Sequence, residues 1–255
     1  MLNFKRTSVI FLMMILFLNV FNVIFGISGW WYVVPGIFLF AMTGIGSFRI
    51  GMSFYFDVIC KVPTTNQIVL TFDDGPDERT TLKVLGVLKK YDANATFFCI
   101  GSKVAQFSDV VLQTHREGHI IANHSYCHND FYGFYSKKKI IADLMQCNQI
   151  IRETIGEKPR FFRPPFGVTN PNMKRALRKF PLIPVGWSLR TLDTVNSDRE
   201  ILMKKLRQTK AGDIILFHDR VEHIEVVLDE FLSFCKQQHL QIARLDEVLN
   251  MPAYE

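Results

Sequence analysis

The sequence predicts an α/β protein in which a parallel sheet wrapped by helices follows two N-terminal membrane-spanning helices. The chain has 255 residues, enough for one enzyme-sized domain with an appendage. Residues 7–48 contain no charged side chain. After residue 61, short apolar runs alternate with helical patterns. This alternation favours a parallel sheet, either a barrel or an open doubly wound sheet.

The uncharged segment is about twice as long as one helix needs to cross a bilayer core of about 30 Å. We expect two spans, at about residues 8–25 and 32–48, with Trp30, Trp31 and Tyr32 at an interface. The segment is too long for a signal peptide, whose apolar region usually covers about 7–15 residues. A buried hairpin in a soluble domain is the alternative, but soluble cores rarely run so far without a charge.

The charges flanking the two spans predict the topology. Lys5 and Arg6 precede the first span, Arg49 and Lys61 follow the second, and the turn between the spans has no charge. The positive-inside rule therefore places both ends of the anchor, and the domain that follows, in the cytoplasm. We accordingly divide the chain into a membrane anchor over residues 1–60 and a second domain over residues 61–255.

Composition narrows the class of protein. The net charge of +6 is mild, and no dense Lys/Arg tract with interleaved aromatic residues is present, so nucleic acid is not an expected partner. The five cysteines are widely spaced and form no C-x-x-C pair, which argues against a disulfide framework or a thiolate metal site. We interpret them as buried free thiols, and their odd number favours a reducing compartment.

Seven strand-like runs are expected in the second domain. They cover residues 67–72, 95–100, 119–122, 161–162, 182–185, 213–217 and 240–243. The helical patterns between and after them cover residues 79–91, 109–117, 136–155, 171–180, 198–208 and 222–237, and a last turn starts at residue 245. A regular barrel has eight strands, so we expect an open groove between the last strand and the first.

Two carboxylates, Asp73 and Asp74, follow the first predicted strand and precede Gly75-Pro76, a rigid turn. One of them could bind a metal while the other stays free as a base. Catalytic groups of parallel barrels lie at the carboxyl ends of strands, which fits this placement. A solvated Asp-Gly turn is the alternative for this motif taken alone.

Two histidines, His124 and His128, are separated by four residues. We expect them to lie on one face of a helical turn, from which both imidazoles reach one ion. Two histidines and one carboxylate with an open position form the ligand set of a hydrolytic zinc site. Two unrelated surface histidines are the alternative. Cys127 has the wrong phase for that face, so we expect it to pack.

Two further motifs carry polar groups. Arg163 lies in Arg163-Pro164-Pro165-Phe166-Gly167, where the prolines and glycine could hold its guanidinium against a carboxylate. A plain loop with a surface arginine is the alternative. His218 ends an apolar strand, and Asp193 is the available carboxylate to orient it.

The ordered motifs T-F-D-D-G-P, H-S-Y-C-H, R-P-P-F-G, W-S-L-R-T-L-D and L-F-H resemble the polysaccharide deacetylase family, which is carbohydrate esterase family four. The likeness covers about residues 67–247. It implies an irregular parallel (β/α) barrel of about seven strands behind the transmembrane hairpin. It also implies a deacetylase acting on peptidoglycan, chitooligosaccharide or another polysaccharide.

The resemblance also implies roles for individual residues. Asp74, His124 and His128 would bind a divalent metal, zinc or cobalt. Asp73 would be the general base, tethered by Arg163, and His218 would be the general acid, positioned by Asp193. The Phe166 N–H would help to stabilise the oxyanion, and Leu216 and Trp187 would line the acetyl pocket. The family often has a tryptophan directly after its motif-four aspartate, where this sequence has Thr194.

Three functions are consistent with these residues. The first is an active glycan N-deacetylase, and the retained base, acid and three ligands favour it. The second is an inactive glycan-binding membrane protein. The third is a deacetylase or deformylase of a lipid-linked amino sugar at the membrane face. Relatives that act on the cell wall work outside the cell, so the resemblance predicts an extracytoplasmic domain where the charge pattern predicts a cytoplasmic one.

Overall fold

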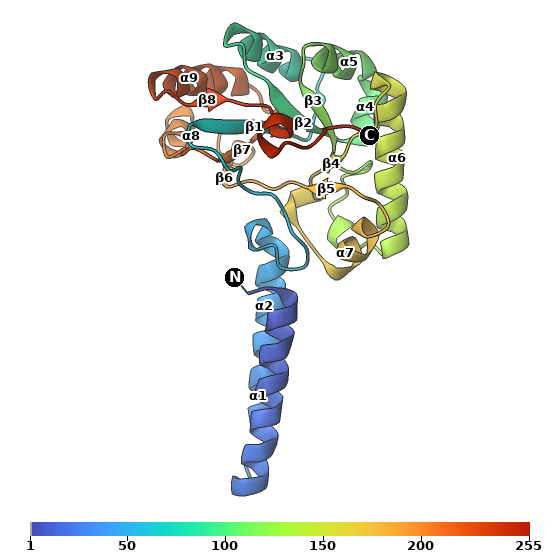
Figure 1. The fold of residues 1–255 in the computed structure, drawn as a ribbon, viewed down its shortest axis with the longest axis vertical. Helices are drawn as coiled ribbons and strands as arrows, with labels where there is room; N and C mark the ends of the chain where they lie inside the picture. Colours follow the sequence, from blue (N-terminus) through green and yellow to red (C-terminus); the bar gives the residue numbers. More distant parts are fainter. Residues whose placement is uncertain (1) are drawn as a thin grey trace.

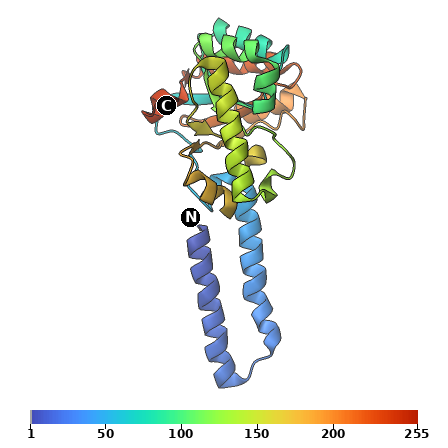
Figure 2. The same ribbon diagram turned by 90° about the vertical axis from the view of Figure 1, so that its right-hand side faces the viewer.

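The computed structural model describes residues 2–255 and consists of a long helical hairpin beneath an α/β domain (Figure 1). The hairpin comprises α1 (Phe4–Phe25), the 3-10 turn η1 (Gly29–Tyr32) and α2 (Val33–Phe48). The two helices run side by side in opposite directions, so the start of α1 and the end of α2 both lie next to the domain (Figure 2). Both expected apolar helices are therefore present, with the first beginning four residues earlier than predicted.

The domain is built on a curled, parallel half-barrel. Its strands are β1 (Gln67–Asp73), β2 (Ala95–Cys99), β3 (Ile120–Asn123), β4 (Phe161–Phe162), β5 (Ile183–Pro184), β6 (Leu189–Arg190), β7 (Ile214–His218) and β8 (Gln241–Ile242). The strand order is β5-β4-β3-β2-β1-β7-β6, with β8 paired to β1. The expected irregular barrel is confirmed.

The expected open groove between the last and first strands is wrong. Gln67 pairs with Gln241 and Ile68 with Ile242, so β8 joins the start of β1 directly. The seven-strand path ends instead at β5 and β6, and the sequence prediction missed β6. Part of this opening is covered by the segment after the hairpin, because Ile59 bridges to Val185 and Lys61 to Asp213.

Helices cover the sheet in the expected alternation. They are α3 (Thr80–Lys90), α4 (Gly101–Gln106), α5 (Ser108–Arg116), α6 (Lys137–Ile155), α7 (Pro171–Leu177), α8 (Arg199–Leu206), α9 (Ile224–Gln237) and α10 (Leu245–Leu249). Three more 3-10 turns are η2 (Ile50–Met52), η3 (Tyr132–Phe134) and η4 (Pro165–Gly167). The strands β1, β2 and β7 are buried along almost their whole length because both faces of the sheet are packed there, which explains their largely apolar sequences.

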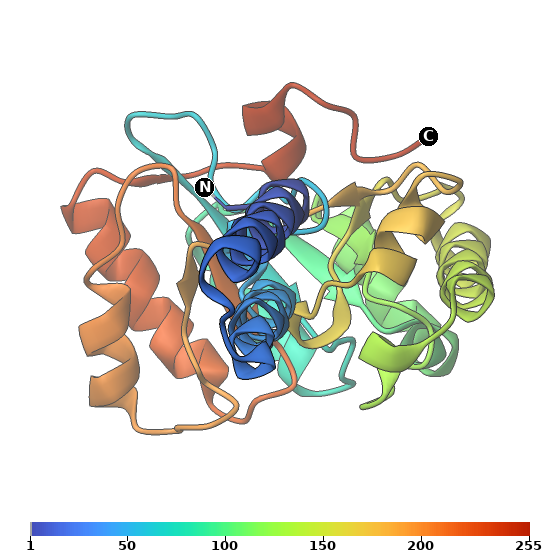
Figure 3. The ribbon, with the colours of Figure 1, turned by 90° about the horizontal axis from the view of Figure 1, so that it is seen from below.

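The hairpin is joined to the domain by specific contacts. The Phe4 N–H donates to the Phe54 carbonyl, and the Thr169 N–H donates to the Ser47 carbonyl. Any side chain at Gly46 would collide with the Phe54 ring, so the close approach of α2 to this segment requires glycine. Seen from below, the hairpin stands under the sheet (Figure 3). The end of α2 is thus hydrogen-bonded to the loop that follows β4.

Candidate active site

The polar residues singled out in the sequence converge at the carboxyl edge of the sheet. Asp73 ends β1, His218 ends β7, and parallel strands bring these ends together. The other predicted site residues lie nearby in the chain: His124 and His128 follow β3, Arg163 follows β4, Phe166 lies in η4, Trp187 lies between β5 and β6, Asp193 follows β6, and Leu216 lies within β7.

Three side chains form a cluster that could hold a metal ion. Potential ligand atoms of Asp74, His124 and His128 all lie within 4.8 Å of one another. Asp74 Oδ1 is 3.5 Å from His124 Nε2 and 3.3 Å from His128 Nε2. Asp74 and His124 are buried, and His128 is half-buried. The predicted ligand set is therefore assembled in one place.

The geometric reason given for the two histidines is wrong. Residues 124–128 form an irregular loop rather than a helical turn, and Ser125 and His128 have positive φ angles of 66° and 43°. The rings still meet, with centroids 4.7 Å apart. Cys127 is exposed and Cys60 is half-buried, against the expectation, while Cys99, Cys147 and Cys235 are buried as expected.

Asp143 on α6 stabilises this loop, and the sequence analysis did not single it out. Its Oδ1 accepts the Tyr126 N–H at 3.0 Å, and its Oδ2 accepts the Cys127 N–H at 3.1 Å. Asp143 is 5% exposed. These N–H groups require a partner where the loop is shielded from water, and the carboxylate supplies it from 17 and 16 residues downstream. No local sequence pattern indicates this contact.

The donor set of the cluster fits a cation. The His124 ring places Nδ1 2.8 Å from the Arg163 carbonyl oxygen, which can only accept, so Nδ1 carries a proton and Nε2 is the ring nitrogen that lies next to Asp74. Burial and the neighbouring His124 lower the pKa of His128 to about 3, which keeps it neutral. Burial favours the protonated form of Asp74, but contacts with His124, His128 and His218 outweigh it and hold the pKa well below its usual range. One carboxylate and two neutral imidazoles are what a divalent metal of this class requires.

Asp73 is held by a fully buried arginine. Arg163 Nη1 donates to Asp73 Oδ1 at 2.7 Å and to Thr71 Oγ1 at 2.8 Å, and its other nitrogens donate to the Val185 and Gly186 carbonyls. The second carboxylate oxygen, Oδ2, lies 3.8 Å from His124 Nε2. One oxygen is therefore fixed, and the other faces the metal cluster.

His218 is oriented by Asp193. Asp193 Oδ1 lies 2.7 Å from His218 Nδ1, and its Oδ2 accepts the His218 backbone N–H at 2.7 Å. Burial favours the neutral ring, but the Asp193 hydrogen bond and the charges of Asp73 and Asp74 outweigh it and raise the pKa of His218. Because Nδ1 of His218 contacts Asp193, Nε2 is the free nitrogen of the ring. Thr194, which stands where the family often has tryptophan, donates its N–H to Asp193 Oδ1.

The remaining predicted residues surround this cluster. Phe166 has a positive φ of 57° and its ring centroid is 4.6 Å from that of His128. Such backbone strain in a non-glycine residue is concentrated at functional sites. Leu216 is buried beside β6, and Trp187 packs so closely against Gly167 that no side chain could replace that glycine.

Two cations also contact Asp74 and were not anticipated. Arg220 Nε donates to Asp74 Oδ2 at 2.9 Å, and Lys103 Nζ donates to the Asp74 backbone carbonyl at 2.7 Å. Arg220 therefore occupies the oxygen that faces away from the histidines, leaving Oδ1 for them. Its position two residues after His218, just beyond a strand end, is the only sequence signal for this role.

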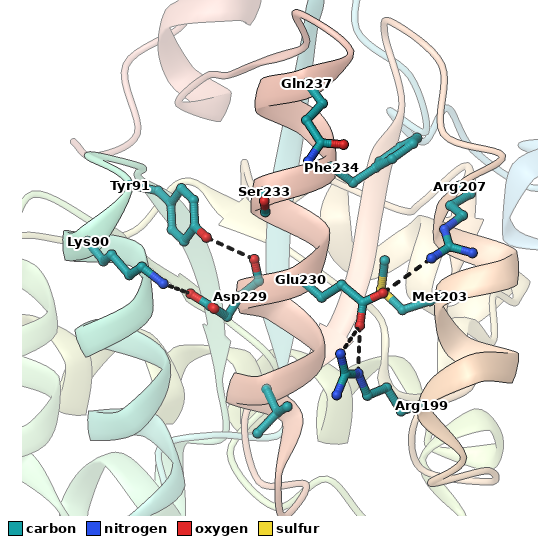
Figure 4. A pocket seen from close by; sticks show the side chains of 11 residues that line it. Lys90, Tyr91, Arg199, Met203, Arg207, Asp229, Glu230, Ser233, Phe234 and Gln237 are labelled. Carbon is teal, nitrogen blue, oxygen red and sulfur yellow. Dashed lines mark hydrogen bonds and ion pairs between the residues drawn. The ribbon is translucent and has the colours of Figure 1, made fainter.

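A large surface cavity elsewhere shows no comparable chemistry. It measures 580 Å³ and lies among α3, α8 and α9 (Figure 4). Its charged side chains are paired with one another: Lys90 with Asp229, and Arg199 and Arg207 with Glu230. The carboxyl edge of the sheet therefore remains the candidate active site.

Comparisons with known proteins identify the family. A sequence model of the polysaccharide deacetylase family matches residues 61–185. The chain is 32% identical over 189 residues to the peptidoglycan-N-acetylglucosamine deacetylase PgdA of Listeria monocytogenes, covering 74% of this chain but only 40% of that protein. It is also 32% identical over 195 residues to a peptidoglycan-N-acetylglucosamine deacetylase of Bacillus cereus, covering 72% of this chain and 70% of that protein.

A solved structure matches the fold closely. The crystal structure of the Bc1960 peptidoglycan N-acetylglucosamine deacetylase superposes with a TM-score of 0.73 at 26% sequence identity. The match covers 77% of this chain and 94% of that one.

Proposed function

Because the chain belongs to the polysaccharide deacetylase family, we propose that it hydrolyses N-acetyl groups from amino sugars of a glycan such as peptidoglycan or chitooligosaccharide. One observation carries the proposal. The Asp74, His124 and His128 cluster lies beside an arginine-tethered carboxylate, Asp73, at the same edge as the His218 and Asp193 pair. These are the groups that amide hydrolysis requires, because one proton must be removed and another delivered to nitrogen.

The cluster would hold a divalent metal, which we propose to be zinc or cobalt. Such an ion polarises the amide carbonyl and lowers the pKa of water from about 15.7 to about 7. Asp73 acts as the base through Oδ2, because Arg163 holds Oδ1. His218 delivers a proton from Nε2 to the leaving nitrogen. Its raised pKa, set by the Asp193 hydrogen bond against the effect of burial, keeps that proton available.

The other residues of the site position the substrate. The Phe166 N–H makes no hydrogen bond to another described residue, so it is available to the oxyanion. We assign Leu216 and Trp187 to the pocket for the acetyl methyl group. Trp187 supports this assignment through its close packing on Gly167, which is next to Phe166 in the chain.

We further propose that α1 and α2 anchor the enzyme domain, residues 61–255, in a membrane. Their apolar side chains face outward; Leu16 is 65% exposed and Phe40 is 82% exposed. A cleavable signal sequence fits less well, because the end of α2 is hydrogen-bonded to Thr169, three residues after Phe166. This contact supports a substrate close to the bilayer, including a lipid-linked amino sugar.

Acetate release tests the activity. The full chain in detergent, loaded with zinc or cobalt, should release acetate from N-acetylglucosamine oligomers or peptidoglycan fragments, and none from the corresponding glucosamine oligomers. A chelator should abolish the reaction, and the metal should restore it. Undiminished release after complete metal removal would contradict the mechanism. The absence of release from every N-acetylated glycan, with folded and metal-loaded protein, would contradict the function.

A further inference from the structure

A second cavity lies where the hairpin meets the domain. Of the residues that line it, only Trp187 also belongs to the proposed active site. It measures 540 Å³ and lies where the end of α2 meets β6 and α8. Figure 1 places β6 directly above the domain end of α2. Among its lining residues are Phe48, Arg49, Trp187, Arg190, Lys205 and Asp213.

The cavity has an excess of positive charge. Arg49, Arg190 and Lys205 have no ion-pair partner among residues 2–255. Asp213 does not neutralise them, because its carboxylate already contacts Lys61 at 3.2 Å, the Ser188 hydroxyl at 2.8 Å and the Lys210 N–H at 2.8 Å. Three cationic side chains therefore line one cavity, and its single carboxylate is paired with Lys61 instead of with any of them.

Two of these cations interact unfavourably. Burial and the nearby Arg190 guanidinium lower the pKa of Lys205. The Arg190 Nε atom is buried without a hydrogen-bond partner in the described part of the chain. A buried, unpaired donor is costly, and an anion with several acceptor oxygens, bound between Arg190 and Lys205, would offset the repulsion of the two cations. The chemistry of the cavity is that of a phosphate site.

The position of the cavity relates it to the bilayer surface. Phe48 is the last residue of α2, is 75% exposed, and is followed directly by Arg49. If α2 spans the membrane, Phe48 lies at the hydrocarbon boundary and Arg49 at the depth of the lipid headgroups. A lipid whose phosphate enters the cavity from this side would place its acyl or prenyl chain alongside Phe48.

We propose that this cavity binds the phosphate group of a membrane lipid, with Arg49, Arg190 and Lys205 as its ligands. The inference rests on the proposed membrane anchor. Trp187 forms the wall shared with the active site, because its ring lies 5.7 Å from the guanidinium carbons of both Arg190 and Arg163. A phosphate held here is thus one side chain away from the arginine that tethers Asp73. A lipid-linked amino sugar is the substrate class that both sites would accept together.

Lipid binding by the full chain in non-ionic detergent tests the proposal. Native mass spectrometry would measure retention of dioleoyl phosphatidic acid and of dioleoylglycerol, which has the same chains but no phosphate. We expect one retained phosphatidic acid and no dioleoylglycerol. The double variant Arg190→Gln, Lys205→Gln should bind it about 30-fold more weakly, since each basic side chain near a membrane surface contributes a few-fold to binding. Lys204→Gln, on the same helix but outside the cavity, is the matched control and should bind normally.

Three outcomes would overturn the proposal. These are equal retention of the two lipids, unchanged binding by the double variant with its melting temperature preserved, and displacement of the lipid by equimolar inorganic phosphate. The last result would assign the cavity to free phosphate rather than to a lipid. Lipid retention is measured without turnover, so a failure of the proposed deacetylation would leave this result standing, and the reverse also holds.

Discussion

Asp143 provides a test of how the metal site is held in place. Asp143→Asn keeps one acceptor oxygen in nearly the same position, so the variant can still bind one of the Tyr126 and Cys127 N–H groups but not both. A hydrogen bond to a charged group contributes about 1.5–3 kcal/mol. Losing one such bond loosens the loop that carries His124 and His128.

The expected consequence is a fall in metal affinity of about 10–100-fold, since about 1.4 kcal/mol corresponds to a factor of ten and loss of a partner behind a ligand has effects of this size. Titrating chelator-treated protein with zinc against a chromophoric competitor measures the affinity. Glu153→Gln, an exposed position on the same helix, is the control and should behave as wild type. Wild-type affinity in the Asp143→Asn variant would refute the reasoning.

Three further predictions follow from the site and its surroundings. His128→Ala should lower the metal content from one ion per chain to near zero by elemental analysis, and His223→Ala, at an exposed position, should not. Burial lowers the pKa of His119 in the folded protein to about 4. Between about pH 6.5 and 4 the imidazole is therefore protonated in the unfolded chain but not in the folded one. The free energy of unfolding should fall by about 3 kcal/mol as the pH drops through that window. His119→Asn, whose Oδ1 can still accept the Ala95 N–H, should flatten this slope in denaturant titrations at several pH values, and an unchanged slope would contradict the assignment. Cys127, the exposed cysteine among the described residues, should react with a membrane-impermeant maleimide in intact cells if the substrate is mature peptidoglycan. Protection of Cys127 in intact cells, with labelling after lysis, would instead place the domain in the cytoplasm, as the charge pattern predicts.

The sequence was most informative where strands are fully buried. The runs at β1, β2 and β7 are apolar on both faces, and their ends marked Asp73 and His218 correctly. Sequence patterns did not predict elements that are short and half-exposed. β6 has two residues, one of them Arg190, and α4 has six, so neither produces a periodic signal.

Contacts between distant parts of the chain were also beyond a reading of local patterns. The pairing of β8 with β1 closed the gap expected there and moved the sheet edges to β5 and β6. Asp143 contacts the loop that carries the two histidines, and Arg220 contacts Asp74, from positions with no motif of their own. The spacing of His124 and His128 identified the right pair for the wrong reason, because the two residues lie in an irregular loop bonded to Asp143 and not in a helical turn.

The most direct test of the central claim is turnover of Asp73→Asn with its metal content measured in the same sample. Asparagine can still accept from Arg163 but cannot act as a base, and Asp73 is not among the three ligands of the cluster. We predict one ion per chain, as in the wild type, with acetate release reduced about 10²–10⁴-fold. Undiminished acetate release, or loss of the metal on this substitution, would contradict the assignment of Asp73 as base and Asp74 as ligand.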